Sequence, residues 1–166
     1  MRIPRLIRHL LTTRRQINRH FSQRSLNAIQ SAIQAAEASH LGEICFAVEA
    51  ALAPIQVFGG VTPHQRAIEV FGELRVWDTD HNSGVLIYVL LADKAVEVIA
   101  DRGIHRKTCH DSVWRDIVDA MQEAFASGRF ESGALQGIAA VSAQLTRHFP
   151  ASGANANELP DHVHLL

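Results

Sequence analysis

The seven residues Val85–Leu91 form an uninterrupted apolar run, VLIYVLL, which is rich in β-branched and aromatic side chains. A run of this length can be a fully buried strand or a short buried helix. Gly84 precedes it and Asp93-Lys94 follows it, and such flanking turn residues favour the strand. Because a strand without polar alternation has both faces covered, this stretch predicts the central strand of a sheet with a layer on each side.

The next segment, residues 95–101, alternates apolar and polar side chains instead. Glu97 and Asp101 fall on one face together with Ile99, which indicates a strand with one solvated face. Only residues 92–94 separate this strand from the apolar run, and a parallel connection needs a dozen residues or more. The two strands are therefore expected to form an antiparallel hairpin.

A third strand is predicted at residues 43–49, where apolar positions alternate with others. Thr62-Pro63 then opens a helix that should end near Val76, because Thr is a good N-cap and Pro fits the first helical position. A strand, a helix and the central strand in this order form a parallel, right-handed unit. The predicted fold class is therefore α/β: a small mixed β-sheet, made of a parallel βαβ unit plus the antiparallel hairpin, sandwiched by helices.

The chain is expected to form one domain, because 166 residues with 47% hydrophobic content suit a single core. Apolar spacing predicts further helices at residues 22–39, from the Asp111 cap to Gly128, and at 132–148, whereas residues 54–60 and 102–110 are predicted to be loops. The predicted organisation is a basic amphipathic helix over residues 1–21, the α/β domain over 22–150, and a flexible C-terminal tail over 151–166, which lacks periodicity.

The first 36 residues carry seven arginines and no acidic residue, whereas the rest carries nine Lys and Arg against seventeen Asp and Glu. Residues 3–21 place apolar side chains three or four apart with arginines between them, which predicts an amphipathic basic helix. Three interpretations stay open: a helix packed on the domain with its arginines in water, an interfacial helix on an anionic membrane, and a transit peptide. Nucleic acid is not expected as a partner, because no aromatic residues lie between the basic ones.

The two cysteines, Cys45 and Cys109, form neither a metal-binding spacing nor a disulfide framework, and they fit a reducing, intracellular compartment. No apolar run is long enough to cross a membrane. Arginines interrupt every apolar run near the N-terminus, so no secretory signal is expected. The expected location is cytoplasmic, with residues 1–21 holding the protein at the inner membrane face or against a membrane-protein partner.

The residues before the central strand, Asp78-Thr79-Asp80-His81-Asn82, resemble the D-x-D-x-N opening of a calcium loop, whose alternate side chains supply oxygen ligands. The full EF-hand pattern fails, because Val89 stands where that loop would need Glu. The hairpin should bring Asp101 beside Asn82. The candidate ligands for Ca2+ or Mg2+ are therefore Asp78, Asp80, Asn82, Asp101 and, where the next helix begins, Asp111.

Other interpretations of these residues stay open. Segment 78–84 can be a polar loop held by local turns, and Arg102 can neutralise Asp101. A zinc site in segment 105–110, where two histidines flank Cys109, is a weaker hypothesis, because three ligands at irregular spacing fall short of the usual four. No nucleophile or general base stands out, so no catalytic residue is predicted.

Four stretches of the chain are distinctive: RAIEVFGELRVWDTDHNSGVLIYVLLADKAVEVIADRGI, a W-x-x-I helix after it, FASGRFESGALQGI, and the closing HFP. They resemble the TPM domain family, and the resemblance covers about residues 25–150. The resemblance implies a small mixed sheet between helices; some members of the family are phosphatases and some bind calcium. In exported relatives an Asn-Gly corner precedes the central strand, whereas here Ser83 stands between Asn82 and Gly84.

Exported members of this family carry a signal peptide and a membrane anchor. This chain resembles the non-exported branch, whose genes neighbour those of LemA-like membrane proteins, and the resemblance therefore implies a membrane-linked complex. The leading prediction is a non-enzymatic binding or scaffold domain that acts at the membrane surface with a LemA-like partner. The alternative prediction is a divalent-metal-assisted phosphatase that uses the acidic residues between Asp78 and Asp101.

Overall fold

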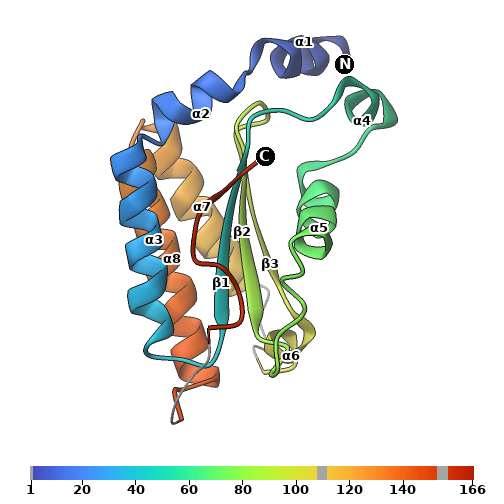
Figure 1. Cartoon of the computed structure of the whole chain (residues 1–166). Helices are drawn as coiled ribbons and strands as arrows, with labels where there is room; N and C mark the ends of the chain where they lie inside the picture. The colour runs from blue at the N-terminus through green and yellow to red at the C-terminus, as the bar shows by residue number, and fades with distance from the viewer. Residues whose placement is uncertain (1, 108–111, 153–156) are drawn as a thin grey trace.

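The computed structural model describes residues 2–107, 112–152 and 157–166. Their strands form a four-stranded sheet in the order β3-β2-β1-β4 (Figure 1), with the bounds Glu43–Glu49 (β1), Gly84–Leu90 (β2), Ala95–Ala100 (β3) and His164–Leu165 (β4). β1 pairs parallel with β2 and β4, and β2 pairs antiparallel with β3. The predicted mixed α/β fold is confirmed, with the apolar run at an interior position of the sheet.

Helices cover both faces of this sheet (Figure 1). One face carries α2 (Arg14–His20), α3 (Gln23–Glu37), α7 (Ser112–Ala126) and α8 (Phe130–His148). The other carries α4 (Pro54–Gly59) and α5 (Pro63–Glu73), and α1 (Arg2–Leu11) crosses the end of the sheet toward α4. The short helix α6 (Arg102–His105) follows β3 at the opposite end. The closed end of the hairpin therefore lies beside α1, whereas the start of β2 lies beside α6.

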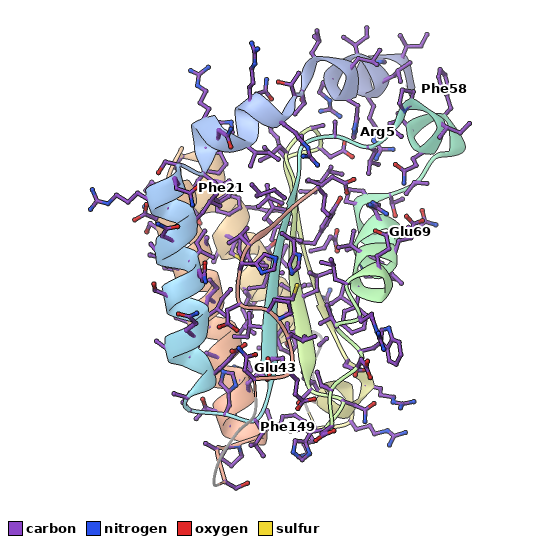
Figure 2. The ribbon with its side chains drawn as sticks, viewed as in Figure 1. Arg5, Phe21, Glu43, Phe58, Glu69 and Phe149 are labelled. Carbon is purple, nitrogen blue, oxygen red and sulfur yellow. The ribbon has the colours of Figure 1, made fainter. Side chains whose placement is uncertain are left out.

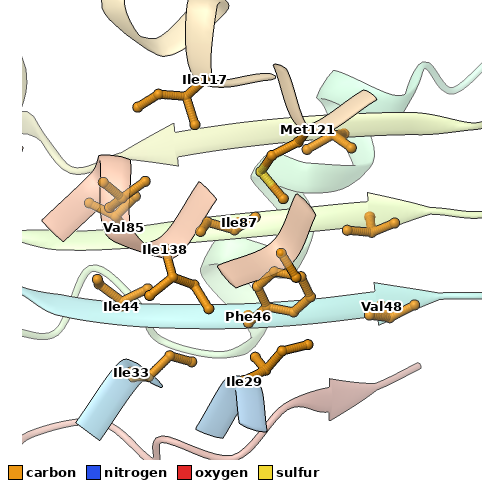
Figure 3. Packing of buried hydrophobic residues seen from close by; sticks show 14 of the residues in the cluster. Ile29, Ile33, Ile44, Phe46, Val48, Val85, Ile87, Ile117, Met121 and Ile138 are labelled. Carbon is orange, nitrogen blue, oxygen red and sulfur yellow. The ribbon is translucent and has the colours of Figure 1, made fainter. Parts of the chain in front are cut away.

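Two apolar layers hold the sheet between these helices. On the first face, Ile29 of α3 and Ile138 of α8 belong to one cluster with Phe46 of β1 (Figure 3). On the second face, Val70 of α5 clusters with Leu86 of β2. Every residue of β2 is buried because the strand contributes side chains to both layers, and this explains why its sequence has no polar position.

Strand β1 is also buried along its whole length, although two of its residues are acidic. Glu49 is 8% exposed and accepts hydrogen bonds from the Tyr88 hydroxyl and, at 3.0 Å, from Arg66 Nε. Burial and the hydrogen bond to Glu49 together raise the pKa of Tyr88 above its usual range. The carboxylate at this end of the strand is thus paired inside the fold instead of being solvated.

The prediction of one continuous helix over residues 3–21 is wrong, because the chain breaks at Thr12 and Thr13 into α1 and α2. The Thr12 hydroxyl donates to the Arg8 carbonyl at 2.8 Å, and Thr13 has the extended backbone of an N-cap. Threonine hydroxyls compete for backbone groups and favour such boundaries. Two predicted loops hold short helices instead: α4 begins at a proline, which suits a first turn, and α6 begins after the Asp101 cap.

The predicted flexible tail contains a strand at its end. Residues 164–165 extend the sheet as β4, and Leu166 donates a backbone hydrogen bond to β1 at 2.9 Å. Upstream, the two carboxylate oxygens of Glu43 accept backbone N–H groups from Glu158 and Leu159, each at 3.3 Å. A strand of two residues is too short to show alternation, so nothing in the sequence marks it.

Candidate functional site

Two of the predicted metal ligands, Asp78 and Asp80, take part in other contacts. The Oδ2 atom of Asp78 lies 2.6 Å from the Arg75 guanidinium in an exposed ion pair. The backbone N–H of Asp80 donates to the Glu158 carboxylate at 2.8 Å, which ties this loop to the C-terminal segment. The Asp78 carboxylate is thus paired with Arg75, three positions away. Asp80 contributes its backbone N–H to the contact that holds the C-terminal segment.

Asn82 and Asp101, in contrast, meet at the start of α6. Arg102 Nε donates to Asn82 Oδ1 at 2.9 Å, and the Arg102 backbone N–H donates to Asp101 Oδ1 at 2.6 Å. Gly103 donates its backbone N–H to the Asn82 carbonyl at 3.1 Å. A Cβ atom at Gly103 would lie 2.5 Å from that carbonyl oxygen, so the close approach of the two segments requires glycine.

The contacts among the described residues leave this rim poorly arranged for a cation. Asp101 Oδ2 is buried and has no hydrogen-bond partner within the described chain, but one buried oxygen is far fewer than the six to eight oxygens that Ca2+ takes. The Arg102 guanidinium donates to Asn82 Oδ1, so this oxygen is already hydrogen-bonded. Among residues 2–107, 112–152 and 157–166, no group of three His, Cys, Asp or Glu side chains is arranged to hold a metal.

Three residues of the earlier hypotheses lie outside the described residues. They are Asp111, the fifth predicted ligand of the divalent cation, and Cys109 and His110 of the zinc hypothesis.

A hollow of about 550 Å³ opens at the rim, and its lining includes Asn82, Arg102, Arg106 and Lys107. Its basic side chains suit an anion better than a cation.

A different group of residues fixes helix α1 on the domain. Arg5 Nη2 lies 2.6 Å from Asp93 Oδ2 and 2.8 Å from the Val61 carbonyl oxygen, on the inner side of α1 (Figure 2). His9 is 4% exposed, and its Nδ1 accepts the Leu52 backbone N–H at 2.9 Å. Because Nδ1 accepts, the ring proton is on Nε2, which donates to Asp93 Oδ1 at 3.1 Å. The helix is therefore held by its polar face.

The apolar face of α1 is consequently turned to the solvent. Its side chains are as much as 70% exposed, and those of the neighbouring helix α4 as much as 76%. Contiguous exposed apolar surface of this kind marks interaction sites. We call this surface the α1–α4 ridge, and it consists of Ile3, Ile7, Leu10 and Leu11 of α1 with Ile55 and Phe58 of α4.

Positive charge flanks the α1–α4 ridge. Arg8 of α1 has a side chain that is 56% exposed, and Arg14, Arg15 and Arg19 of α2 are exposed as well. The interpretation in which the basic helix packs on the domain and shows its arginines to water fits α2, whose Ile17 is buried, but it does not fit the apolar stripe of α1. Arg5 faces inward, and the apolar stripe faces outward, because Asp93 binds the polar face.

A buried group of carboxyls holds the C-terminal segment. Glu37 is 9% exposed, and its Oε1 accepts the Ile44 backbone N–H at 3.0 Å. Burial, followed by the nearby carboxyls of Glu43 and Asp161, raises the pKa of Glu37 to about 8. Burial, followed by the charges of Glu158 and Asp161, also raises the pKa of Glu43. Protonation of Glu37 and Glu43 therefore favours the folded state, in which the C-terminal segment lies against these carboxyls.

The sequence reasoning missed the roles of Asp93, His9 and Ile55. One signal was present: Arg5 and His9 are four positions apart, so they share the helix face opposite to Ile3. A helix whose polar face carries two groups able to bind one carboxylate can dock by that face. The local sequence of Asp93 indicates only a turn, and nothing in it points to α1.

The fold and these surfaces define a small mixed α/β domain with an exposed amphipathic helix. No helix in the described part of the chain has the length and apolar character needed to span a bilayer. The model of the TPM domain matches residues 18–144, and the chain belongs to the TPM domain family. No curated protein matches the chain.

Two solved structures, each from a different bacterium, have the same fold. The NMR structure of the BA42 protein from the psychrophilic Bizionia argentinensis is 29% identical, with a TM-score of 0.77 over 88% of this chain and 95% of that chain. The NMR structure of the N-terminal domain of a P. gingivalis protein is 18% identical, with a TM-score of 0.61 over 85% of this chain and 94% of that chain. The second likeness concerns the fold alone.

Proposed function

We propose that this TPM domain is a binding module that docks on an anionic membrane surface through the α1–α4 ridge. The observation that carries the proposal is the orientation of α1: buried polar contacts from Arg5 and His9 to Asp93 hold the helix with its apolar face outward. A helix that only completed the fold would bury that face. An amphipathic helix that lies in a membrane interface presents its apolar side to the acyl region and basic residues to the headgroups.

The energetic terms agree with reversible docking. Each exposed Ile or Leu of the ridge that enters the acyl region contributes up to about 1.5–3 kcal/mol. Each arginine near an anionic surface adds on the order of 1 kcal/mol, and this contribution falls with salt. Arg8, Arg14 and Arg15 are exposed close to the ridge in the chain. A LemA-like membrane protein, the partner that the family resemblance suggested, would then share the bilayer with the docked domain.

Co-sedimentation with vesicles tests this function. Deleting residues 1–21 would remove the buried Ile17 and Phe21 from the core, so substitutions are the sounder probe. We expect the native protein to sediment with anionic vesicles at low salt and to stay in solution with neutral ones. The double variant Ile7→Ser/Leu10→Ser should lose most of this binding.

Ile68→Ser is the matched control, because Ile68 lies on α5 and is 51% exposed, close to the 49% of Ile7. It should bind like the native protein. Arg14→Gln/Arg15→Gln should bind more weakly, with a smaller dependence on salt. An absence of binding at low salt, or an equal loss in the Ile68→Ser control, would overturn the proposed function.

A divalent-metal-assisted phosphatase is the second candidate, and the basic hollow lined by Arg102, which follows Asp101 in the chain, favours it. Arg102, Arg106 and Lys107 line that hollow and could bind a phosphate group. The protein should be assayed on a generic phosphate ester with and without Mg2+ or Ca2+. Turnover that needs the cation and is abolished by Asp101→Asn would place this activity first, whereas turnover unchanged by Asp101→Asn would rule out this rim.

A further inference from the structure

A second hollow, of about 950 Å³, lies at the closed end of the hairpin. Helices α2 and α7 cover this face of the sheet (Figure 1). We call this opening the α2–α7 hollow. One wall is the end of α1 with α2 and Lys94, the floor is residues 89–92 with Ala95, and the other wall is the last turns of α7 with the start of α8. The break at Thr12 and Thr13 explains the opening, because α1 turns away toward α4 and leaves the end of α7 uncovered.

The inner surface of the α2–α7 hollow is mostly apolar. Leu11 forms part of one wall, Leu91 part of the floor, and Phe125, Ala126 and Phe130 part of the other wall. Phe125 and Phe130 stack on one another with ring centroids 5.0 Å apart, so they present a fixed aromatic surface. A hollow of this volume with an apolar lining is in the range of sites that bind small amphiphilic ligands.

Charged side chains of opposite sign occupy its two walls. Arg8 and the exposed Lys94 lie on the side of α1 and the hairpin, and the exposed Asp119 and Glu123 lie on α7. Arg8 is only loosely engaged elsewhere, with its Nη2 atom 3.5 Å from Asp93 Oδ1. A ligand head that carries both a phosphate and an ammonium group would complement both walls, whereas a purely anionic head would face two carboxylates.

Leu11 and Arg8 connect this hollow to the α1–α4 ridge. Leu11 is a member of the ridge and is 70% exposed, and it also lines the hollow. A lipid that leaves a bilayer at the ridge could therefore reach the hollow along one continuous surface. This continuity favours a lipid over a peptide that would arrive from water.

We propose that the α2–α7 hollow binds a single-chain zwitterionic phospholipid, with its acyl chain on the apolar floor and its head between the basic and the acidic wall. The phosphate binds at Arg8 and Lys94, and the ammonium group binds at Asp119 and Glu123. The source of the ligand rests on the proposed membrane function, but the binding event itself needs no bilayer. The two ideas can therefore fail separately.

Titration calorimetry with a short-chain lysophosphatidylethanolamine, kept below its critical micelle concentration, tests the site without any membrane. We expect saturable binding that is about tenfold tighter than that of the matching lysophosphatidic acid, which lacks the ammonium group. Ala126→Trp should fill the hollow and weaken binding at least about tenfold. Ala120→Trp, an exposed alanine of the same helix outside the lining, should have no effect.

Two charge variants test the phosphate and the ammonium group of the lipid head separately. Lys94→Gln should weaken both lipids, whereas Glu123→Gln should weaken only the lipid that carries the ammonium group. Equal affinity for the two lipids, equal effects of the two tryptophan variants, or no saturable heat would each overturn the proposal. Failure of the native protein to bind anionic vesicles at low salt, with intact binding of the monomeric lipid, would refute the membrane function alone.

Discussion

Arg5 Nη2 lies 2.6 Å from Asp93 Oδ2, and this pair decides which face of α1 the protein shows to its surroundings. Asp93 belongs to the turn of the β2–β3 hairpin, and its side chain is 8% exposed. His9 adds a second hydrogen bond to the same carboxylate. Asp93 is 88 positions away from Arg5 in the sequence, yet it anchors the N-terminal helix. The apolar stripe of that helix is left facing the solvent.

Asp93→Asn should loosen α1 and lower the free energy of unfolding by about 2 kcal/mol, the scale of a buried hydrogen bond to a charged group. Burial alone would raise the pKa of Asp93, but hydrogen bonds from Arg5 and His9 hold it below its usual range. This stabilisation is therefore present above the ordinary aspartate pKa and is lost as the pH falls through the lowered one.

Urea unfolding at pH 7 and at pH 3 measures this contribution. The gap between the native protein and Asp93→Asn should be wide at pH 7 and narrow at pH 3. Asp116→Asn, at an exposed position on α7, is the control and should change little at either pH. A gap that does not change with pH would mean that the charge of Asp93 is not what holds α1.

The sheet could be predicted from the sequence because its signals are local. Val85–Leu91 is apolar throughout, and the three residues after Leu91 leave room only for an antiparallel return. The contact of residues 164–165 with β1 depends on Glu43 and on two leucines that reach the core from the chain end. Such long-range contacts leave no period in the sequence.

Less of the candidate site could be predicted from the sequence. Spacing indicated correctly where Asn82 and Asp101 meet, since the hairpin fixes their ends. Spacing could not show that Arg102 would donate hydrogen bonds to both residues, or that Arg75 would form an ion pair with Asp78. The orientation of α1 depends on which of its two faces finds a partner, and that is a tertiary property.

The buried carboxyl of Glu37 should make the protein less stable as the pH rises. Its pKa is raised from 4.5 to about 8, so the folded state binds a proton that the unfolded state releases. The associated stability is complete below the unfolded pKa and is lost as the pH rises through the folded value. We therefore expect the free energy of unfolding to fall between about pH 4.5 and pH 8.

Glu37→Gln should flatten this dependence, because an amide keeps the acceptor for the Ile44 backbone N–H without ionising. Urea unfolding of both proteins at pH 5.5 and pH 8 is the measurement, and the variant should be the more stable protein at pH 8. Glu123→Gln, at an exposed position on α7, serves as the control. An equal fall in both proteins would assign the pH dependence to other groups.

Gly84 should not tolerate alanine, because a Cβ there would lie 1.9 Å from the Val76 carbonyl oxygen. The backbone of β2 would have to shift, and we expect Gly84→Ala to cost about 2–3 kcal/mol. Gly72 in α5 has nothing within 4 Å of the same built atom. Gly72→Ala should stabilise the protein by about 0.5–1 kcal/mol through its helix propensity.

Thermal unfolding of the two variants checks the sign of both changes. The melting temperature should fall in Gly84→Ala and rise in Gly72→Ala. A Gly84→Ala variant that melts like the native protein would show that the segment before β2 can move away from the strand.

The rim formed by Asp78, Asp80, Asn82 and Asp101 should bind calcium weakly, with a Kd on the order of a millimolar. Arg75 and Arg102 engage two of the four side chains, and the described residues leave one buried oxygen free, Oδ2 of Asp101. Calorimetry with CaCl2 measures the affinity directly. Asp101→Asn should remove what binding there is, whereas Asp116→Asn should leave it unchanged. A micromolar or tighter site would contradict this expectation, and it would show that a cation displaces Arg102 from Asn82 at little cost.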